Sequence, residues 1–284
     1  MEITLLEPQS YCAGVKLALE KLSNECKENK DLYVLGPIIH NKMINDYYES
    51  QGIQILDIKN NTKENILKNI KNSTVVFQAH GSSDECYKIC EENNNKIIDA
   101  TCPYVSLIHK KIKEKIDNNY DVIYIGKNGH EESEATRSIS EKVHLIENIN
   151  DINLLEINNS LIYATNQTTL SILDIKNIYD KLKEKFPKII IDNKICDATY
   201  KRQKAILESK NADLFIVIGD KSSSNSKRLY ELATKKGKAI FINNVNDIIN
   251  YDFTSVNSVV ITSGASTPFE VVLEVKAFLE ALAK

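Results

Sequence analysis

Three cysteines, Cys12, Cys102 and Cys196, stand 90 and 94 residues apart in the 284-residue chain. Three thiolates that met at one point would form a soft-metal site, for which zinc and an iron-sulfur cluster are the candidates. Structural zinc usually takes Cys-x-x-Cys pairs that are close in sequence, whereas these cysteines lie about a third of the chain apart. The spacing favours an iron-sulfur cluster, in which three cysteine ligands would leave one iron without a protein ligand and open to a substrate.

Two further sets of polar residues repeat at the same interval. Counted from each cysteine, the residues 28 positions later are His40, His130 and Ser224, and those 66 to 70 positions later are His80, Thr168 and Ser266. All nine residues follow apolar runs that we predict to be strands, and parallel sheets place ligand sites at the carboxyl ends of their strands. Because histidine titrates near neutral pH, such a site could bind anions and move protons.

Two short stretches add candidate groups to these sets. Ser223, Ser224 and Asn225 offer hydroxyl and amide donors at a predicted helix start, which could cradle an anion. A plain N-cap cluster is the alternative, and this stretch alone leaves both open. Glu132 and Glu134 lie beside His130, and a carboxyl group whose pKa is raised by burial is a good proton donor. Spacing alone does not say which glutamate would act.

The other cysteines and histidines do not share this register. Cys26, Cys86 and Cys90 have no matching partners, and Cys86 and Cys90 fit one face of a helix, so we predict that they are structural. His109 and His144 fall within helical and strand patterns, which is typical of ordinary surface or core residues. A buried structural role is also the simplest interpretation of any single cysteine, but three at matched positions favour a shared site.

Twelve apolar, β-branched runs alternate with helical patterns, which predicts βαβ units and parallel sheets. The predicted strands are 3–6, 32–35, 53–56, 75–78, 96–99, 122–125, 143–146, 161–164, 189–191, 214–218, 239–242 and 259–262. They fall into three groups of four, so we expect repeat units at 1–94, 95–187 and 188–284, with a first strand open to exchange between neighbours. The predicted fold is α/β: three repeated sub-domains, each a four-stranded mostly parallel sheet flanked by helices, around a pseudo-threefold axis with a central cavity.

Composition excludes several classes of protein. The formal net charge of -3 argues against a broad nucleic-acid footprint, which needs a basic face. No stretch approaches the roughly 20 apolar residues of a membrane span, and the start MEITLLEPQS lacks the features of a secretory signal. Six cysteines spread along such a chain indicate reduced thiols or metal binding, so we expect a cytoplasmic location.

Nine motifs resemble those of the 4-hydroxy-3-methylbut-2-enyl diphosphate reductase family, which acts last in the non-mevalonate isoprenoid pathway. The motifs occur in one order over nearly the whole chain: YCAGVKLALE, GPIIHN, AHGSS, IDATCPYV, GKNGHEESEAT, NQTTLS, ICDATYKRQ, KSSSNSKRL and SGASTP. The resemblance implies an enzyme that removes the allylic hydroxyl of (E)-4-hydroxy-3-methylbut-2-enyl diphosphate by two-electron reduction. The expected products are isopentenyl diphosphate and dimethylallyl diphosphate.

The resemblance also assigns cofactor, partners and residues. It implies a 4Fe-4S cluster on Cys12, Cys102 and Cys196 with one open iron, and a ferredoxin or flavodoxin-type electron donor. We also expect a monomer. The residues implied to hold the diphosphate are His40, His80, Ser223, Ser224, Asn225 and Ser266. His130, Glu132 and Thr168 are implied to serve the hydroxyl end, with Glu132 heading a proton relay; the choice of Glu132 over Glu134 comes from this resemblance.

The chain departs from the family pattern at a few positions, and other functions are conceivable. Glu131 stands where proline is common, Ser82 where valine is common, and Tyr200 and Lys201 precede the Arg-Gln pair after Cys196. The extra carboxylate of Glu131 could perturb Glu132. A non-catalytic iron-sulfur protein would need a fourth cysteine ligand and no polar cavity. A structural zinc protein and a nucleotide-binding module are further alternatives, but neither a Walker A pattern nor GxGxxG occurs.

Overall fold

The computed structural model describes residues 1–26, 31–58 and 60–283 and contains all twelve predicted strands, each within two residues of its predicted ends. The strands are β1 Glu2–Leu5, β2 Leu32–Leu35, β3 Gln54–Leu56, β4 Thr74–Phe77, β5 Lys96–Asp99, β6 Asp121–Ile125, β7 Val143–Ile146, β8 Ile162–Asn166, β9 Ile190–Ile191, β10 Leu214–Ile218, β11 Ala239–Ile242 and β12 Ser258–Ser263. The β-branched runs therefore identified the sheets reliably.

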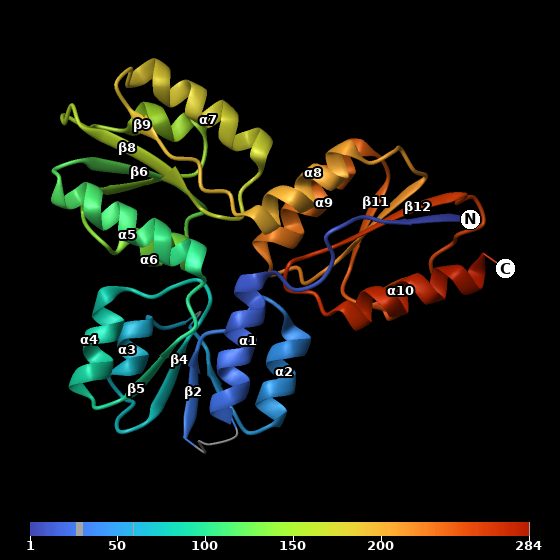
Figure 1. The fold of residues 1–284 in the computed structure, drawn as a ribbon, viewed down its shortest axis with the longest axis horizontal. Helices are drawn as coiled ribbons and strands as arrows, with labels where there is room; N and C mark the ends of the chain where they lie inside the picture. The colour runs from blue at the N-terminus through green and yellow to red at the C-terminus, as the bar shows by residue number, and fades with distance from the viewer. Residues whose placement is uncertain (27–30, 59, 284) are drawn as a thin grey trace. The chain divides into compact units, whose positions relative to one another are not determined.

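Helices connect these strands, as the pattern predicted (Figure 1). The α-helices are α1 Ala13–Cys26, α2 Lys42–Ser50, α3 Lys63–Leu67, α4 Asp84–Glu92, α5 Pro103–Asp117, α6 Glu131–Arg137, α7 Ile172–Lys185, α8 Asp197–Glu208, α9 Ser224–Lys236 and α10 Phe269–Leu282, and the 3-10 helices are η1 Ile149–Leu154 and η2 Val245–Ile248. Within the described residues, no helix is long and apolar enough to cross a membrane.

The strands form three four-stranded sheets in which every pairing is parallel. Their orders are β1-β12-β10-β11, β3-β2-β4-β5 and β7-β6-β8-β9. The first strand of each predicted group thus pairs with the last strand of another group: β1 with β12, β5 with β4, and β9 with β8. The α/β class with three helix-flanked four-stranded sheets is confirmed, whereas the unit boundaries at 94 and 187 stay a prediction.

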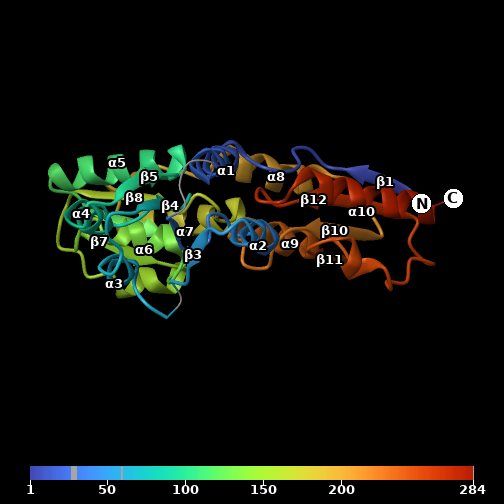
Figure 2. The same cartoon turned by 90° about the horizontal axis from the view of Figure 1, so that it is seen from below.

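Alternate residues of the central strand β10 supply two separate hydrophobic cores. Leu214, Ile216 and Ile218 pack with α10 on one face of the sheet. Phe215 and Val217 pack with α8 and α9 on the other face (Figure 2). A strand that is buried on both faces has apolar residues at every position, so β10 shows no alternation of apolar and polar residues.

Contacts divide the chain into two compact units. The first contains Met1–Val15, His40–Lys42 and the chain from Cys196 on, and so includes the sheet β1-β12-β10-β11. The second contains the remaining described residues and the other two sheets. The candidate residues are divided between these units, and each unit is described below by itself.

Glycines at two strand ends allow a helix to approach closely. A Cβ atom on Gly219, just after β10, would lie 2.4 Å from Ser226 Oγ in the first turn of α9. A Cβ atom on Gly126, just after β6, would lie 2.5 Å from Ser133 Oγ in α6. Both pairs are seven residues apart, so two of the strand-helix junctions that carry candidate residues are built alike.

This junction gives a test of the packing. Gly219→Ala should lower the free energy of unfolding by about 1–3 kcal/mol, because the added methyl group overpacks the junction. Adding Ser226→Ala removes the nearest clashing atom and should recover part of the loss. The measurement is urea unfolding of both single variants and the double variant. Strictly additive effects in this cycle would contradict the proposed contact.

Candidate functional site

The structure places all nine repeated residues after the carboxyl ends of parallel strands, as the sequence predicted. Each cysteine follows β1, β5 or β9, and each is succeeded within one residue by a helix, α1, α5 or α8. The loops after β2 and β6 carry His40 and His130, and Ser224 is the first residue of α9, which follows β10. The loops after β4, β8 and β12 carry His80, Thr168 and Ser266. The strand-end loops and the helix starts that follow them therefore present the nine side chains.

In the first unit, hydrogen bonds hold the short segment His40–Lys42 against two strand-end loops. Asn41 Nδ2 donates to the carbonyl oxygen of Ser266 at 2.8 Å, and Ser266 Oγ donates to the carbonyl oxygen of His40 at 3.0 Å. The backbone N–H of Lys42 donates to Asp220 Oδ2 at 2.7 Å. His40 and Ser266, which are 226 residues apart, are thus brought together as predicted.

Beside them lies the predicted Ser-Ser-Asn stretch. Ser223 is the N-cap of α9, and its Oγ accepts from Ser226 N at 3.3 Å. Thr199 Oγ1 donates to Asn225 Oδ1 at 3.3 Å. Among the residues described, no acceptor lies within reach of the buried Asn225 Nδ2. The stretch is therefore a helix cap, and it also holds a buried amide donor that an anion could satisfy.

The three cysteines share a helix-terminal environment. Cys102 and Cys196 are the N-cap residues of α5 and α8, and Val15 N donates to Cys12 Sγ at 3.4 Å at the start of α1. All three thiols are half-buried and free of disulfides. Because the amino terminus of a helix stabilises negative charge, each position suits the thiolate sulfur of a metal ligand.

A buried arginine adds positive charge near two of these thiols. Arg202 is only 2% exposed and donates to the carbonyl oxygens of Ser263 at 3.2 Å, Ala198 at 3.1 Å and Ser10. Burial lowers the pKa of the guanidinium, and the neighbouring Cys12 and Cys196 raise it. Half-buried thiols at helix starts, with a fixed cation beside two of them, suit an anionic thiolate-ligated metal cluster.

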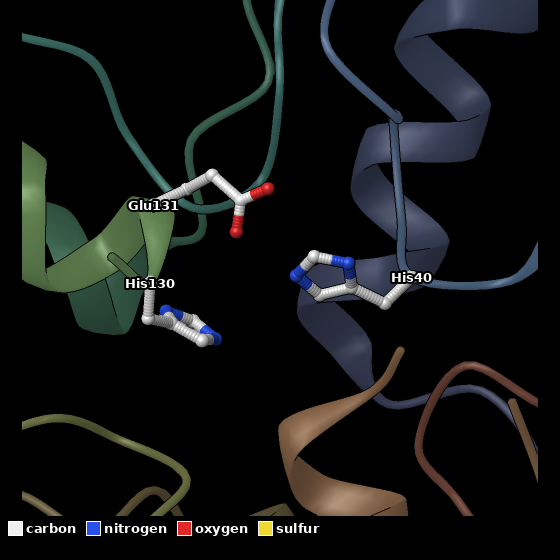
Figure 3. Close-up of side chains that lie close together, drawn as sticks. All are labelled: His40, His130 and Glu131. Carbon is white, nitrogen blue, oxygen red and sulfur yellow. The ribbon is translucent and has the colours of Figure 1, made fainter. Parts of the chain in front are cut away.

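In the second unit, α6 begins with candidate side chains. His130 is its N-cap, and Nδ1 of that ring accepts from Glu132 N at 3.2 Å. Figure 3 shows the side chains of His130 and Glu131 projecting from the start of this helix. The His80 and His130 rings meet edge to face, with their centroids 5.7 Å apart. The loops after β4 and β6 therefore place two imidazoles together, as the sequence predicted.

Glu132 is a buried carboxylate, only 2% exposed, with three hydrogen-bond donors. Thr168 donates to it through its backbone N–H and through Oγ1, both at 2.8 Å, and Tyr124 OH donates at 3.3 Å. Burial raises the pKa of Glu132 to about 7, and the three hydrogen bonds oppose that rise. A carboxyl group with such a pKa can both hold and release a proton at neutral pH.

Glu134, the alternative, has a different environment. It accepts from Gly129 N at 2.9 Å and pairs with Arg137 at 2.9 Å, and its side chain is 38% exposed. The first contact joins Glu134 to the loop before α6, the second joins it to the last residue of the helix, and the carboxylate stays partly exposed to water. The geometry therefore favours Glu132 as the proton-transferring group, a choice that spacing alone could not make.

The remaining cysteines and histidines have the ordinary surroundings that we predicted. Cys86 and Cys90 lie on one buried face of α4 within its core, where burial raises the pKa of Cys86 to about 12 and that of Cys90 to about 11. His144 in β7 pairs with Asp121 at 2.7 Å. His109 Nε2 lies 3.0 Å from Thr136 Oγ1, and burial lowers the pKa of that ring to about 4.

Sequence reasoning missed two residues near the candidate groups. Tyr124 lies inside the apolar run of β6, and nothing in that run distinguishes a phenol that reaches Glu132 from a core aromatic. Arg202 belongs to the Arg-Gln pair that we noted only as a motif. A lone arginine within a helix that begins at a predicted metal ligand is the signal that could have identified it.

The raised pKa of Glu132 predicts a pH-dependent stability difference. Between about pH 4.5 and 7 the folded chain keeps a proton that the unfolded chain has released, so the free energy of unfolding falls as pH rises. Glu132→Gln removes the titrating group and with it this loss. The free energy of unfolding of the variant minus that of wild type, measured by urea unfolding, should rise by up to about 3 kcal/mol between about pH 5 and pH 8. A difference independent of pH would contradict the assignment.

Comparison with known proteins gives consistent results. The 4-hydroxy-3-methylbut-2-enyl diphosphate reductases of Halalkalibacterium halodurans and Bacillus subtilis are each 40% identical to the chain, and each alignment covers 99% of the chain and 91% of the relative. The solved structure of the E-1-hydroxy-2-methyl-but-2-enyl-4-diphosphate reductase from Plasmodium falciparum superposes with a TM-score of 0.90 at 32% identity. That superposition covers 100% of the chain and 88% of the other.

A second solved structure, of (E)-4-hydroxy-3-methyl-but-2-enyl diphosphate reductase, superposes with a TM-score of 0.71 at 26% identity and covers 99% of this chain and 100% of that one. The model of the family described as LytB protein matches residues 3–280. These sequence and structure matches span all three sheets. The chain belongs to the LytB protein family.

Proposed function

We propose that the chain is a 4-hydroxy-3-methylbut-2-enyl diphosphate reductase. In this reaction the allylic carbon-oxygen bond breaks, two electrons and two protons enter, and the hydroxyl group leaves as water, which yields isopentenyl and dimethylallyl diphosphate. Family membership over residues 3–280 supports the proposal, as do full-length relatives that carry this name. The single observation that carries it furthest is Glu132, a buried carboxyl group with a pKa of about 7 beside candidate substrate-binding residues.

The proposal includes an iron-sulfur cluster. LytB family membership implies such a cofactor in general, and we assign the 4Fe-4S form with Cys12, Cys102 and Cys196 as ligands and one open iron. When bound, the cluster would supply the two electrons and a Lewis acid that weakens the carbon-oxygen bond. The helix starts behind the thiols and the buried Arg202 would stabilise the negative charge of the thiolates.

We assign the diphosphate to donors that the fold holds in place. The residues are His40, His80, Ser223, Ser224, Asn225 and Ser266. Support comes from the buried Asn225 amide nitrogen at the start of α9 and from the hydrogen bonds that fix the His40 and Ser266 loops. Donors that are already oriented lose little entropy when an anion binds, so they bind it more tightly than mobile side chains.

Glu132 would deliver the proton that converts the leaving hydroxyl group into water. Thr168 Oγ1 donates to Glu132 Oε2, so the hydroxyl of Thr168 can connect the carboxyl group to the substrate oxygen. His130, which caps the same helix, would orient the hydroxyl end. Exclusion of water from the buried carboxyl group keeps the proton available for this transfer.

Partners and location belong to the same proposal. The two electrons would come from a ferredoxin or flavodoxin-type protein, the donor that the family resemblance implies. We propose that the chain acts as a monomer in the cytoplasm, where the free thiols would remain reduced.

Anaerobic purification tests the proposed function. The protein should contain about four iron and four sulfide per chain, in line with a 4Fe-4S cluster. It should also consume the allylic diphosphate when a strong low-potential reductant is added, and its electron paramagnetic resonance spectrum should change with substrate. Serine at any one of the three cysteines should abolish turnover, while Cys90→Ser should retain the cluster. Zinc as the sole metal, with no turnover, would contradict the proposal.

Glu132 has its own test. Glu132→Gln should reduce kcat by about 10²–10⁴-fold, the usual contribution of a general acid, and should leave the iron content unchanged. Glu134→Gln is the matched control on the same helix and should stay within about threefold of wild type, because the Glu134 carboxylate is partly exposed and bonds only to Gly129 N and Arg137 among the contacts given above. Near-normal kcat in Glu132→Gln would remove the residue from the mechanism.

A further inference from the structure

Gln78, which follows β4 directly, is fully buried and makes contacts that no part of the proposed reaction requires. One end of its side-chain amide lies 2.8 Å from the carbonyl oxygen of Pro37 and 3.2 Å from Nδ1 of His80. The other end lies 2.8 Å from Lys63 Nζ. All of these residues belong to the second unit.

The hydrogen-bonding capacities of these groups fix the orientation of the amide. The carbonyl oxygen of Pro37 can only accept, so it requires the N–H₂ end of Gln78. Lys63 Nζ donates to the carbonyl oxygen of Gly81 at 3.0 Å and supplies the donor for the amide oxygen. Burial lowers the pKa of Lys63, yet a neutral amine would still carry the two N–H bonds that these acceptors need. The amide is therefore held at both ends.

This orientation determines where the proton lies on His80. Because an amide N–H₂ group donates, Nδ1 of His80 must be the acceptor, and the neutral ring then carries its proton on Nε2. His130 has the same pattern by a different route, since its Nδ1 accepts from the backbone N–H of Glu132. Two adjacent rings, 5.7 Å apart, are thus both set as Nε2–H donors.

We propose that Lys63 and Gln78 form a positioning pair that holds His80 in its Nε2–H tautomer, so that the ring presents a hydrogen-bond donor to the diphosphate. The proposal rests on the diphosphate role proposed for His80. A ring with the other tautomer would turn a lone pair toward an anion and repel it. The pair acts through His80 and touches no substrate, so it should govern binding more than the rate of the chemical step.

The tautomer can be observed directly. The chain has five histidines, and a long-range ¹H–¹⁵N correlation spectrum of the oxidised holoenzyme with ¹⁵N-labelled histidine separates Nε2–H from Nδ1–H rings. The His80 signals are assigned by their loss in His80→Asn. We expect an Nε2–H ring for His80 in the wild-type protein. An Nδ1–H ring there would overturn the proposal without any variant of Gln78.

Gln78→Glu tests the consequence for binding. A carboxylate at this position would accept from Nδ1–H, so the neutral His80 ring should change to the Nδ1–H tautomer and lose its Nε2–H donor. The KM for the allylic diphosphate and the inhibition constant of inorganic pyrophosphate should both rise about tenfold or more, the cost of one hydrogen bond to a charged group, while kcat stays within about threefold. Gln78→Met removes both hydrogen-bonding ends of the amide and replaces Gln78→Glu in the test if that charged variant does not fold. In Gln78→Met, His80 should be a mixture of both tautomers, and KM should rise less.

Gln51→Glu adds the same charge at an exposed site of the same unit and should change neither value. Unchanged KM and pyrophosphate inhibition in both Gln78 variants would overturn the positioning role. A wild-type chain with the expected His80 ring that neither turns over the allylic diphosphate nor binds pyrophosphate would overturn the proposed function, and the role of the pair with it.

Discussion

The shared direction of the strands is the constraint on which the rest of the structure depends. Every strand pairing is parallel, so within each sheet the carboxyl ends lie along one edge, and loops far apart in the sequence meet there. Thr168, just after β8, reaches Glu132, just after the neighbouring strand β6, from 36 residues away. An antiparallel arrangement would have sent alternate loops to the opposite edge.

The second feature of the site is that its polar groups are oriented by backbone and by buried partners. His130 is held by a backbone N–H at the start of α6, and Glu132 by the backbone N–H and hydroxyl of Thr168. Burial of Glu132 raises its pKa while those donors limit the rise, and the balance lies near neutral pH. The same groups that stabilise the loops therefore set the protonation on which the proposed chemistry relies.

Much of this could be predicted from the sequence, and the part that could not has a physical explanation. Runs of apolar, β-branched residues mark strands locally, and the repeat offsets can be counted along the chain. All twelve strands, and the positions of Cys12 and His130 after them, were therefore predictable. Tyr124 and Gln78 were not predicted, because their importance depends on where their side chains point in the folded chain. Both lie in or directly after apolar strands, where they resemble core residues.

The central claim is that the chain holds a 4Fe-4S cluster with three cysteine ligands and an open iron that serves the allylic substrate. Mössbauer spectroscopy of ⁵⁷Fe-loaded protein tests it most directly. One iron of the four should differ from the other three and should alone change its parameters when the allylic diphosphate is added. Four equivalent irons that ignore the substrate, or a protein that binds no iron under anaerobic conditions, would contradict the account.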